Sequence, residues 1–465
     1  MRTAGLVRIG FAALWGLTTS LAWGAGSLVA QAQPPGKVYW EARHQESGVG
    51  LSVYLPAGGS SDPAGAEGTA FLFGMTLQAE AGRILAPMGA RLQVDVGLEH
   101  TSVTMFAPAR QWAAAWREVA GLLSGTPLPD GAVRAAREQL LDQLMFEAGA
   151  PVRAFEIEWN RMRLDGLLPG GTNVARAVRG TLPGVGSATA SSLEDWRREN
   201  IRWQEAVVAV VGPVSESEVR MGSGSVESLG GVVPVTRPDS PGARDPGPVT
   251  SDSLTREAAG APLPPPPLRI GVPSARLELP SGGARHPWNR IERRVINQEI
   301  TSTWIGMAWP IPGGTPLVLR DFLSHVLSDA LNPTPPDPGL YRADVRLERL
   351  GGSSLLIVEA TVDPQATLQW EARILETLAG VADAPTPGAF FELARRRYRT
   401  ARLLEAADPA ERARWIATRA AVEGRVPQVS PESWGLSREG LGALAGSLGD
   451  PRILIFGPER MMTPR

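Results

Sequence analysis

The sequence is 465 residues long, is 43% apolar and carries a formal net charge of −2. A chain of this kind can bury more than one hydrophobic core, while its small net charge gives no electrostatic reason to expect a nucleic-acid or anionic-membrane partner. Because the sequence contains no cysteine, disulfides, thiolate metal sites, thiol catalysis and an N-terminal lipid-modified cysteine are excluded.

Residues 1–32 have the pattern of an export signal. Arg2 and Arg8 supply the positive charge, residues 9–29 form an apolar uncharged run, and Ala30-Gln31-Ala32 fits the small-x-small cleavage rule. We expect cleavage after Ala32 and a periplasmic or secreted protein with no further membrane span. The apolar run is long, so an uncleaved N-terminal anchor is the alternative.

Residues 33–213 are expected to form a first domain. Alternating apolar and polar residues predict strands, and apolar residues that recur every three or four positions predict helices. Ser192, with Asp195 three residues later, predicts a capping box at the start of the last helix. The expected elements are a strand at 49–56, a helix at 68–86, a hairpin at 91–96 and 101–106, helices at 110–123, 130–146, 152–167 and from 192, and a buried strand at 206–211.

Residues 214–287 are expected to be a linker. Ser, Gly, Pro and Asp dominate this stretch, which includes Pro264-Pro265-Pro266-Pro267 and few periodic apolar positions. Such a composition buries too little apolar surface to offset the entropy lost on ordering. Short pieces such as residues 268–272 could still dock as extended strands.

Residues 288–465 repeat the order of the first domain with different residues. The expected elements are a strand at 301–309, a helix at 316–331, a hairpin at 341–350 and 354–363, helices at 367–381, 386–406, 409–424 and 437–448, and a strand at 452–456. Both domains close on an apolar strand followed by Gly-Pro, at 206–213 and 452–458. This repetition suggests an internal duplication, and strands in sequential hairpins favour an α+β fold over a doubly wound sheet.

Three blocks of the first domain carry a family resemblance. A strand from Leu51 leads through Gly58 to Gly68-Thr69-Ala70, a hairpin follows Gly89, and Arg179-Gly180-Thr181 precedes a helix and an apolar strand. In this order the blocks resemble the M16 (insulinase and mitochondrial-processing-peptidase-like) metallopeptidases. The resemblance covers nearly all of the chain apart from the signal and the linker. It implies two homology domains of the α/β-sandwich, LuxS/metallohydrolase-like type that close around a peptide.

The zinc ligands that this family uses are missing. Family members hold zinc with an H-x-x-E-H helix and a distant glutamate, and the motif glutamate activates the bound water. The resemblance places these positions at Phe71, Gly74 and Met75. Phenylalanine has no lone pair, glycine has no side chain to accept a proton, and a thioether is a poor zinc ligand.

The distant glutamate of the family would fall within residues 136–144. Glu138, Asp142 and Gln143 are the candidates there, and the preferred alignment places Gln143 at this position. A single carboxylate in this helix could not hold zinc alone, so the resemblance predicts a degenerate metal site.

Other chemistries find no support in the sequence. The four histidines do not lie at helical ligand spacing; they are His44, His100, His286 and His325. Gly222-Ser223-Gly224-Ser225 falls in the expected linker and not between a strand and a helix, as a nucleophile elbow would. No phosphate-binding or dinucleotide-binding glycine motif is present, and we expect no cofactor.

The second domain carries one residue that matches a substrate-binding position of the family. Gly339-Leu340-Tyr341 resembles the end of a family segment whose arginine and tyrosine bind substrate, so Tyr341 could line a peptide groove. No arginine stands at the matching position within 332–337, and Arg342 follows the tyrosine. The alternative is a strand tyrosine without a binding role.

These features favour an exported, non-catalytic M16-like subunit. Such a chain would pair with a zinc-bearing M16 peptidase to complete a peptide chamber, or act as a core subunit of a larger complex. Trp112 and Trp116, four residues apart on one helix, could add to an interface or pack on their own sheet. The alternatives are a divergent zinc metalloendopeptidase and a stand-alone peptide-binding scaffold.

Overall fold

The computed structural model describes most of the chain after the expected signal. The described residues are 36–165, 178–223, 229–235, 288, 290–333, 337–350, 353–383, 388–424, 426 and 435–458. The expected export signal, most of the expected linker and His286 lie outside these ranges. Among the described residues, none of the helices is both long enough and apolar enough to cross a membrane.

The first half is built on a sheet with the strand order β3-β4-β2-β5-β1-β6. Strand β4 pairs antiparallel with β3 and with β2, and β2 pairs antiparallel with β5. Strand β1 runs parallel to β5 and to β6. The strands are β1 (Gly36–Ala42), β2 (Gly48–Leu55), β3 (Arg91–Val96), β4 (Thr101–Pro108), β5 (Val207–Gly212) and β6 (Leu229–Pro234). The helices that follow them in this half are α1 (Thr69–Leu85), α2 (Trp112–Ser124), α3 (Asp130–Ala148), α4 (Pro151–Leu164), α5 (Leu182–Ser187), α6 (Ala190–Asn200) and α7 (Glu216–Ser223).

The second half is built on a sheet with the order β7-β11-β8-β10-β9. Its strands are β7 (Glu292–Asn297), β8 (Thr303–Ile311), β9 (Leu340–Leu350), β10 (Ser353–Val362) and β11 (Arg452–Gly457). Its helices are α8 (Leu317–Leu331), α9 (Thr367–Asp383), α10 (Gly388–Ala407), α11 (Pro409–Glu423) and α12 (Arg438–Gly446).

The two sheets have matching topologies. The order β3, β4, β2, β5, β1 corresponds to β9, β10, β8, β11, β7, and in each sheet the first strand of the half runs parallel to its last apolar strand. Strand β6 has no counterpart among the described residues of the second half. The correspondence supports the predicted internal duplication, and the predicted α+β class is confirmed.

Each sheet is covered on one face by helices of its own half. In the first half, apolar residues such as Leu51, Val53 and Met105 form a core with α1, α2, α3 and α6. In the second half, residues such as Met307 and Leu356 form the corresponding core with α8, α9, α10 and α12. Trp112 and Trp116 are buried in the first of these cores, so they pack within their own half.

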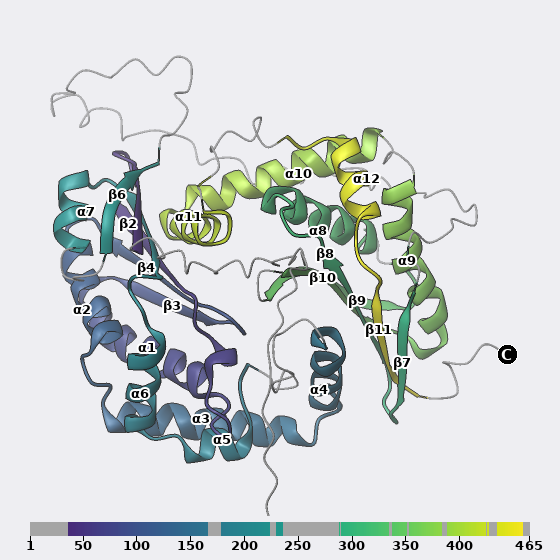
Figure 1. The fold of residues 1–465 in the computed structure, drawn as a ribbon, viewed down its shortest axis with the longest axis horizontal. Coiled ribbons are helices and arrows are strands. Elements are labelled where there is room, and N and C mark those ends of the chain that lie inside the picture. Colours follow the sequence, from purple (N-terminus) through teal and green to yellow (C-terminus); the bar gives the residue numbers. More distant parts are fainter. Residues whose placement is uncertain are drawn as a thin grey trace, which may run out of the picture. The chain divides into compact units, whose positions relative to one another are not determined.

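The opposite face of each sheet is covered by a helix from the other half. Helix α11 packs on β2, β4 and β5 of the first sheet, and α4 packs on β8 and β11 of the second (Figure 1). Because both faces are covered, β2 is buried along its whole length. The two halves therefore exchange one helix each.

Helix α11 is fixed to the first sheet by a close backbone approach and a buried ion pair. The backbone of Pro409 passes so close to Gly50 that a Cβ at Gly50 would lie 2.1 Å from the Pro409 carbonyl carbon. Arg412 of α11 donates to Glu41 of β1 at 2.8 Å, and the two side chains are only 3% and 2% exposed. Arg43 reinforces this contact by donating to Glu41 and to the Ala406 carbonyl.

Helix α4 is fixed to the second sheet in a related way. The indole of Trp159 lies over Gly306 of β8, where a Cβ would come within 2.8 Å of the ring, and its Nε1 donates to Glu359 at 2.7 Å. Phe155 meets the rings of Trp304 and Phe456 edge-on. Burial alone would raise the pKa of Glu359, but hydrogen bonds from Arg346 and Trp159 lower it below its usual value.

The structure differs from the sequence-based expectations in several places, among them the unexpected strands β1 and β7. Within the range expected to be linker, residues 216–223 form α7 and residues 229–234 form β6, where a short apolar stretch pairs with β1. The capping box of α6 is formed by Thr189 and Ser192, not by Ser192 and Asp195. Ser192 is thus the third residue of that helix, and its Oγ accepts a hydrogen bond from the Thr189 N–H.

We expect Gly50→Ala to lower the free energy of unfolding by about 3 kcal/mol or more, because the new Cβ collides with helix backbone that cannot yield. Gly82→Ala is the matched control. A Cβ at Gly82, in the middle of α1, would have nothing within 4 Å, so alanine should raise stability by up to about 1 kcal/mol. Urea denaturation measures both variants, and equal effects would contradict the close approach of α11 to β2.

Candidate functional site

The candidate site begins at the N-terminus of α1. The carboxylate of Asp62 accepts hydrogen bonds from the backbone N–H groups of Gly68 and Ala70, at 2.6 and 2.8 Å. A negative charge at this end of a helix satisfies exposed donors and complements the helix dipole. Gly68 has a φ of +99° and lies against the Arg179 carbonyl, so glycine is required there for both reasons.

Phe71, Gly74 and Met75 lie on the side of α1 that packs against β3. Phe71 and Met75 are half-buried and, with Val94 and Val96 of β3, pack against the core of the first half. Gly74 is buried, and a Cβ there would lie 2.5 Å from Val96 Cγ2. The position matched to the catalytic glutamate therefore has no room for a side chain unless Val96 moves.

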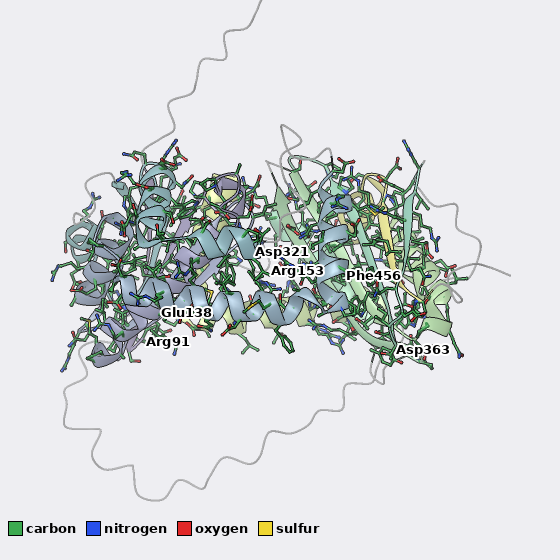
Figure 2. The ribbon with its side chains drawn as sticks, turned by 90° about the horizontal axis from the view of Figure 1, so that it is seen from below. Arg91, Glu138, Arg153, Asp321, Asp363 and Phe456 are labelled. Carbon is green, nitrogen blue, oxygen red and sulfur yellow. The ribbon has the colours of Figure 1, made fainter. Side chains whose placement is uncertain are left out.

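The structure does not turn Gln143 toward this cluster. Gln143 is exposed on α3, as are Glu138, labelled in Figure 2, and Asp142. The buried residues of α3, which share a core with α1, are Val133, Ala136, Leu140 and Leu144. Gln143, the residue that the preferred alignment matches to the distant glutamate of the family, thus lies on the solvent side of α3.

Acidic residues that the sequence analysis did not single out lie near the N-terminus of α1. Glu147, at the end of α3, forms an ion pair with Arg179, and Arg179 also contacts Glu156 at 3.4 Å. Glu67 accepts from Thr181 Oγ1 at 3.1 Å. Each of these carboxylates has a partner, and the described residues contain no group of three metal-ligating side chains. The signal that could have revealed them is the matched block Arg179-Gly180-Thr181, which folds back onto Gly68.

The remaining predicted residues are dispersed. Tyr341 is 63% exposed on the outer strand β9, where its hydroxyl donates to Asp363 at 3.5 Å. His44 is exposed. His325 on α8 lies 3.9 Å from Asp329, and burial lowers its pKa. The structure therefore brings Phe71, Gly74 and Met75 together but places Gln143 and Tyr341 on exposed surfaces.

A hollow of about 590 Å³ follows the outer strand β3. Arg91, labelled in Figure 2, lines it at the start of the strand, and its guanidinium lies 4.8 Å from the ring centre of Phe106. Gln78 of α1 accepts a hydrogen bond from the Val94 N–H at 2.8 Å. The Val94 N–H is therefore not free to pair with a further strand at this edge of the sheet.

His100 stacks on Tyr54 at the far end of the first sheet. Their ring centres are 5.0 Å apart and the rings are nearly parallel. Burial, and then the charge of Arg349, lower the pKa of His100 below its usual value, against the opposing charges of Asp95 and Glu348. His100 is therefore neutral at pH 7.

The fold is similar to those of solved peptidase structures. A protease from Helicobacter pylori matches with a TM-score of 0.66 and 11% identity, over 90% of this chain and 96% of its own. An inactive M16 peptidase domain from Pseudomonas fluorescens matches with a TM-score of 0.64 and 14% identity, over 93% and 98%. The periplasmic protease PqqL from Escherichia coli matches at 0.61 and 12%, over 90% of this chain and 44% of PqqL. No family model and no curated protein matches the sequence.

The contact between Gly74 and Val96 predicts an energetic coupling. Gly74→Ala should lower the free energy of unfolding by about 1–3 kcal/mol, and the loss should shrink in a Val96→Ala background because the smaller side chain leaves space. Gly131→Ala is the control, since a Cβ there would have nothing within 4 Å. Its effect should add to that of Val96→Ala. Additive effects of Gly74→Ala and Val96→Ala in urea denaturation would show that β3 does not press on Gly74.

The lowered pKa of His100 predicts a pH dependence of stability. Below about pH 6.5 the unfolded state takes up a proton at His100 that the folded state resists, so stability falls as the pH falls. His100→Phe keeps the stacking on Tyr54 and should show a shallower loss between pH 7 and pH 5. Urea denaturation at both pH values measures this, and the contribution of His325 is present in both proteins. Identical slopes would contradict the prediction.

Proposed function

We infer that this chain, which has the fold of M16-like peptidases, is an exported, non-catalytic protein of that structural class. The observation that carries the inference is the packing of α1 on β3. Where the family's chemistry needs a general base, the chain has Gly74 against Val96, and where it needs two imidazoles it has Phe71 and Met75. These residues suit apolar packing and offer zinc no ligand.

Two further observations support a non-catalytic role. Gln143 is exposed on α3, so the preferred position for the distant ligand also lacks both a carboxylate and an inward orientation. The similar domain from Pseudomonas fluorescens is described as an inactive M16 domain. Loss of catalysis on an intact M16-like fold therefore has a precedent among similar structures.

The proposed role is to complete a peptide-binding chamber with an active partner. A non-catalytic chain that keeps both halves of the fold can still supply a wall of such a chamber or act as a structural core subunit. Export is supported by the charge and apolar pattern of residues 1–32, and the similar PqqL is a periplasmic protease. We place the protein in the periplasm or outside the cell, paired with a zinc-bearing M16-like subunit.

The decisive test measures zinc and cleavage on the purified chain. We expect sub-stoichiometric zinc by elemental mass spectrometry and no cleavage of a fluorogenic peptide library above buffer. Stoichiometric zinc together with cleavage that a chelator abolishes would instead establish a divergent metalloendopeptidase. Affinity purification from the native host tests the partner: recovery of a chain with an intact H-x-x-E-H motif supports pairing, whereas recovery only as a monomer supports a stand-alone scaffold.

Restoring the motif should not restore activity. We expect the variant Phe71→His, Gly74→Glu, Met75→His to remain without peptidase activity, because Val96 occupies the space of the new glutamate and Gln143 offers no carboxylate. The control Phe71→Leu, Met75→Leu should fold and be equally inactive. Robust, chelator-sensitive cleavage by the triple variant would show that the rest of the site is intact.

A further inference from the structure

A second cavity, of about 390 Å³, is lined by no residue of α1, the helix that contains Phe71, Gly74 and Met75. It opens where the exchanged helix α11 passes between the ends of β2 and β4 on one side and the ends of β9, β10 and the helix α8 on the other. Residues from both halves line it, among them Tyr54, Ser102, Arg320, Arg349 and Trp415. Its size is within the range of small-molecule sites.

The acidic residues that line this cavity are neutralised by neighbouring arginines. Asp95 and Glu411 pair with Arg414 at 3.6 and 2.6 Å, and Glu405 pairs with Arg402 at 2.7 Å. The remaining two are Asp321, labelled in Figure 2, which pairs with Arg419, and Glu348, which pairs with Arg163. Each acidic side chain of the lining therefore has an arginine partner within 4 Å.

Two lining arginines have no carboxylate within ion-pair distance among the described residues. Arg320 is 8% exposed, donates through Nη1 to Ser354 Oγ, and its Nε has no hydrogen-bond partner. Arg349 is half-buried and is the strand partner of Ser354, so it projects from the same face of the second sheet. Burial lowers the pKa of Arg320; the charges of Glu423 and Asp321 oppose this effect, whereas the charge of Arg349 adds to it. The charge of Arg349 also lowers the pKa of His100. An anion bound between these two like charges would stabilise both of them.

The cavity also offers an uncharged donor and an apolar wall. Ser102 Oγ is buried and has no hydrogen-bond partner, and the phenol of Tyr54 is next to Arg349. Leu317, Leu347, Val422 and the indole of Trp415 supply the apolar part of the lining. Guanidinium and hydroxyl donors beside apolar surface suit a ligand with one anionic oxygen group and a small apolar body.

We propose that this cavity binds the carboxylate of a small, partly apolar ligand through Arg320, Arg349 and Ser102. A free C-terminal residue of a peptide is the source of such a group that agrees with the proposed function, and this choice of source rests on that function. The carboxylate site itself does not: it rests on the two arginines, the unpartnered hydroxyl and the cavity.

Calorimetric titration of the full-length chain tests the proposal. N-acetyl-leucine should bind, and N-acetyl-leucine amide, which lacks the charge, should bind at least about tenfold more weakly. Arg349→Gln should weaken binding of the acid by a similar factor. The control is Arg414→Gln, because Arg414 lines the same cavity but already has two carboxylate partners. Equal binding of acid and amide, or no effect of Arg349→Gln, overturns the proposal.

Titrations with a peptide and with inorganic phosphate identify which kind of anion the cavity binds. A hexapeptide ending in leucine with a free C-terminus should bind at least as tightly as N-acetyl-leucine, and its C-terminal amide should not. Binding of N-acetyl-leucine without binding of the peptide overturns the peptide source, and tighter binding of inorganic phosphate overturns the carboxylate assignment. Zinc and cleavage assays are independent of these results, so failure of the proposed function and failure of this inference remain distinguishable.

A folding measurement guards against a variant that merely unfolds. In the absence of ligand, Arg349→Gln should leave the midpoint of thermal unfolding unchanged or raise it, because it removes a like charge near Arg320. Arg414→Gln should not raise it, since it breaks two ion pairs. A clear fall of the midpoint for Arg349→Gln would show that its charge is already neutralised within the protein, which overturns the proposal.

Discussion

The exchange of α4 and α11 is the contact on which the rest of this structure depends. Each sheet has two apolar faces, and the helices of its own half cover only one of them. The second face of the first sheet would be open to water without Ala413, Ile416 and Ala417 of α11. Neither half therefore buries both faces of its sheet by itself. Because exposed apolar surface costs about 25 cal/mol per Å², separating the halves is unfavourable, and we expect them to unfold together.

The exchange of α11 also brings charged side chains of the two halves together. The ion pair between Glu41 and Arg412 is almost completely buried, so loss of either partner leaves a charge without compensation, at a cost of about 3–5 kcal/mol. Helix α11 contributes Trp415 and Arg419 to the cavity that also contains Arg320 and Arg349. The helix that closes one sheet thus forms a wall of the proposed carboxylate site, whereas the Phe71–Met75 cluster belongs to the first half alone.

Most helices and strands could be predicted from the sequence because their signals are local. The strand at 49–56 and the helix at 68–86 differ from β2 and α1 by a residue or so at each end. The exchange could not be predicted, because Glu41 and Arg412 are 371 residues apart and an amphipathic helix does not specify which sheet it covers. That Phe71, Gly74 and Met75 stand where the resembled motif has two histidines and a glutamate can be read from the sequence alone. The closure of that site by Val96, and the exposure of Gln143, depend on packing that no motif encodes.

The exchanged helix α11 also affects how the chain is made. The last strand of the antiparallel part of the first sheet ends at Gly212, and α11 begins roughly 200 residues later. At about 5–20 residues per second, synthesis of the intervening chain takes roughly 10–40 s. During this interval the apolar face that includes Tyr39, Tyr54 and Val211 has no cover. The apolar face of the nascent first half therefore stays exposed to water for many seconds before the helix that covers it has been synthesised.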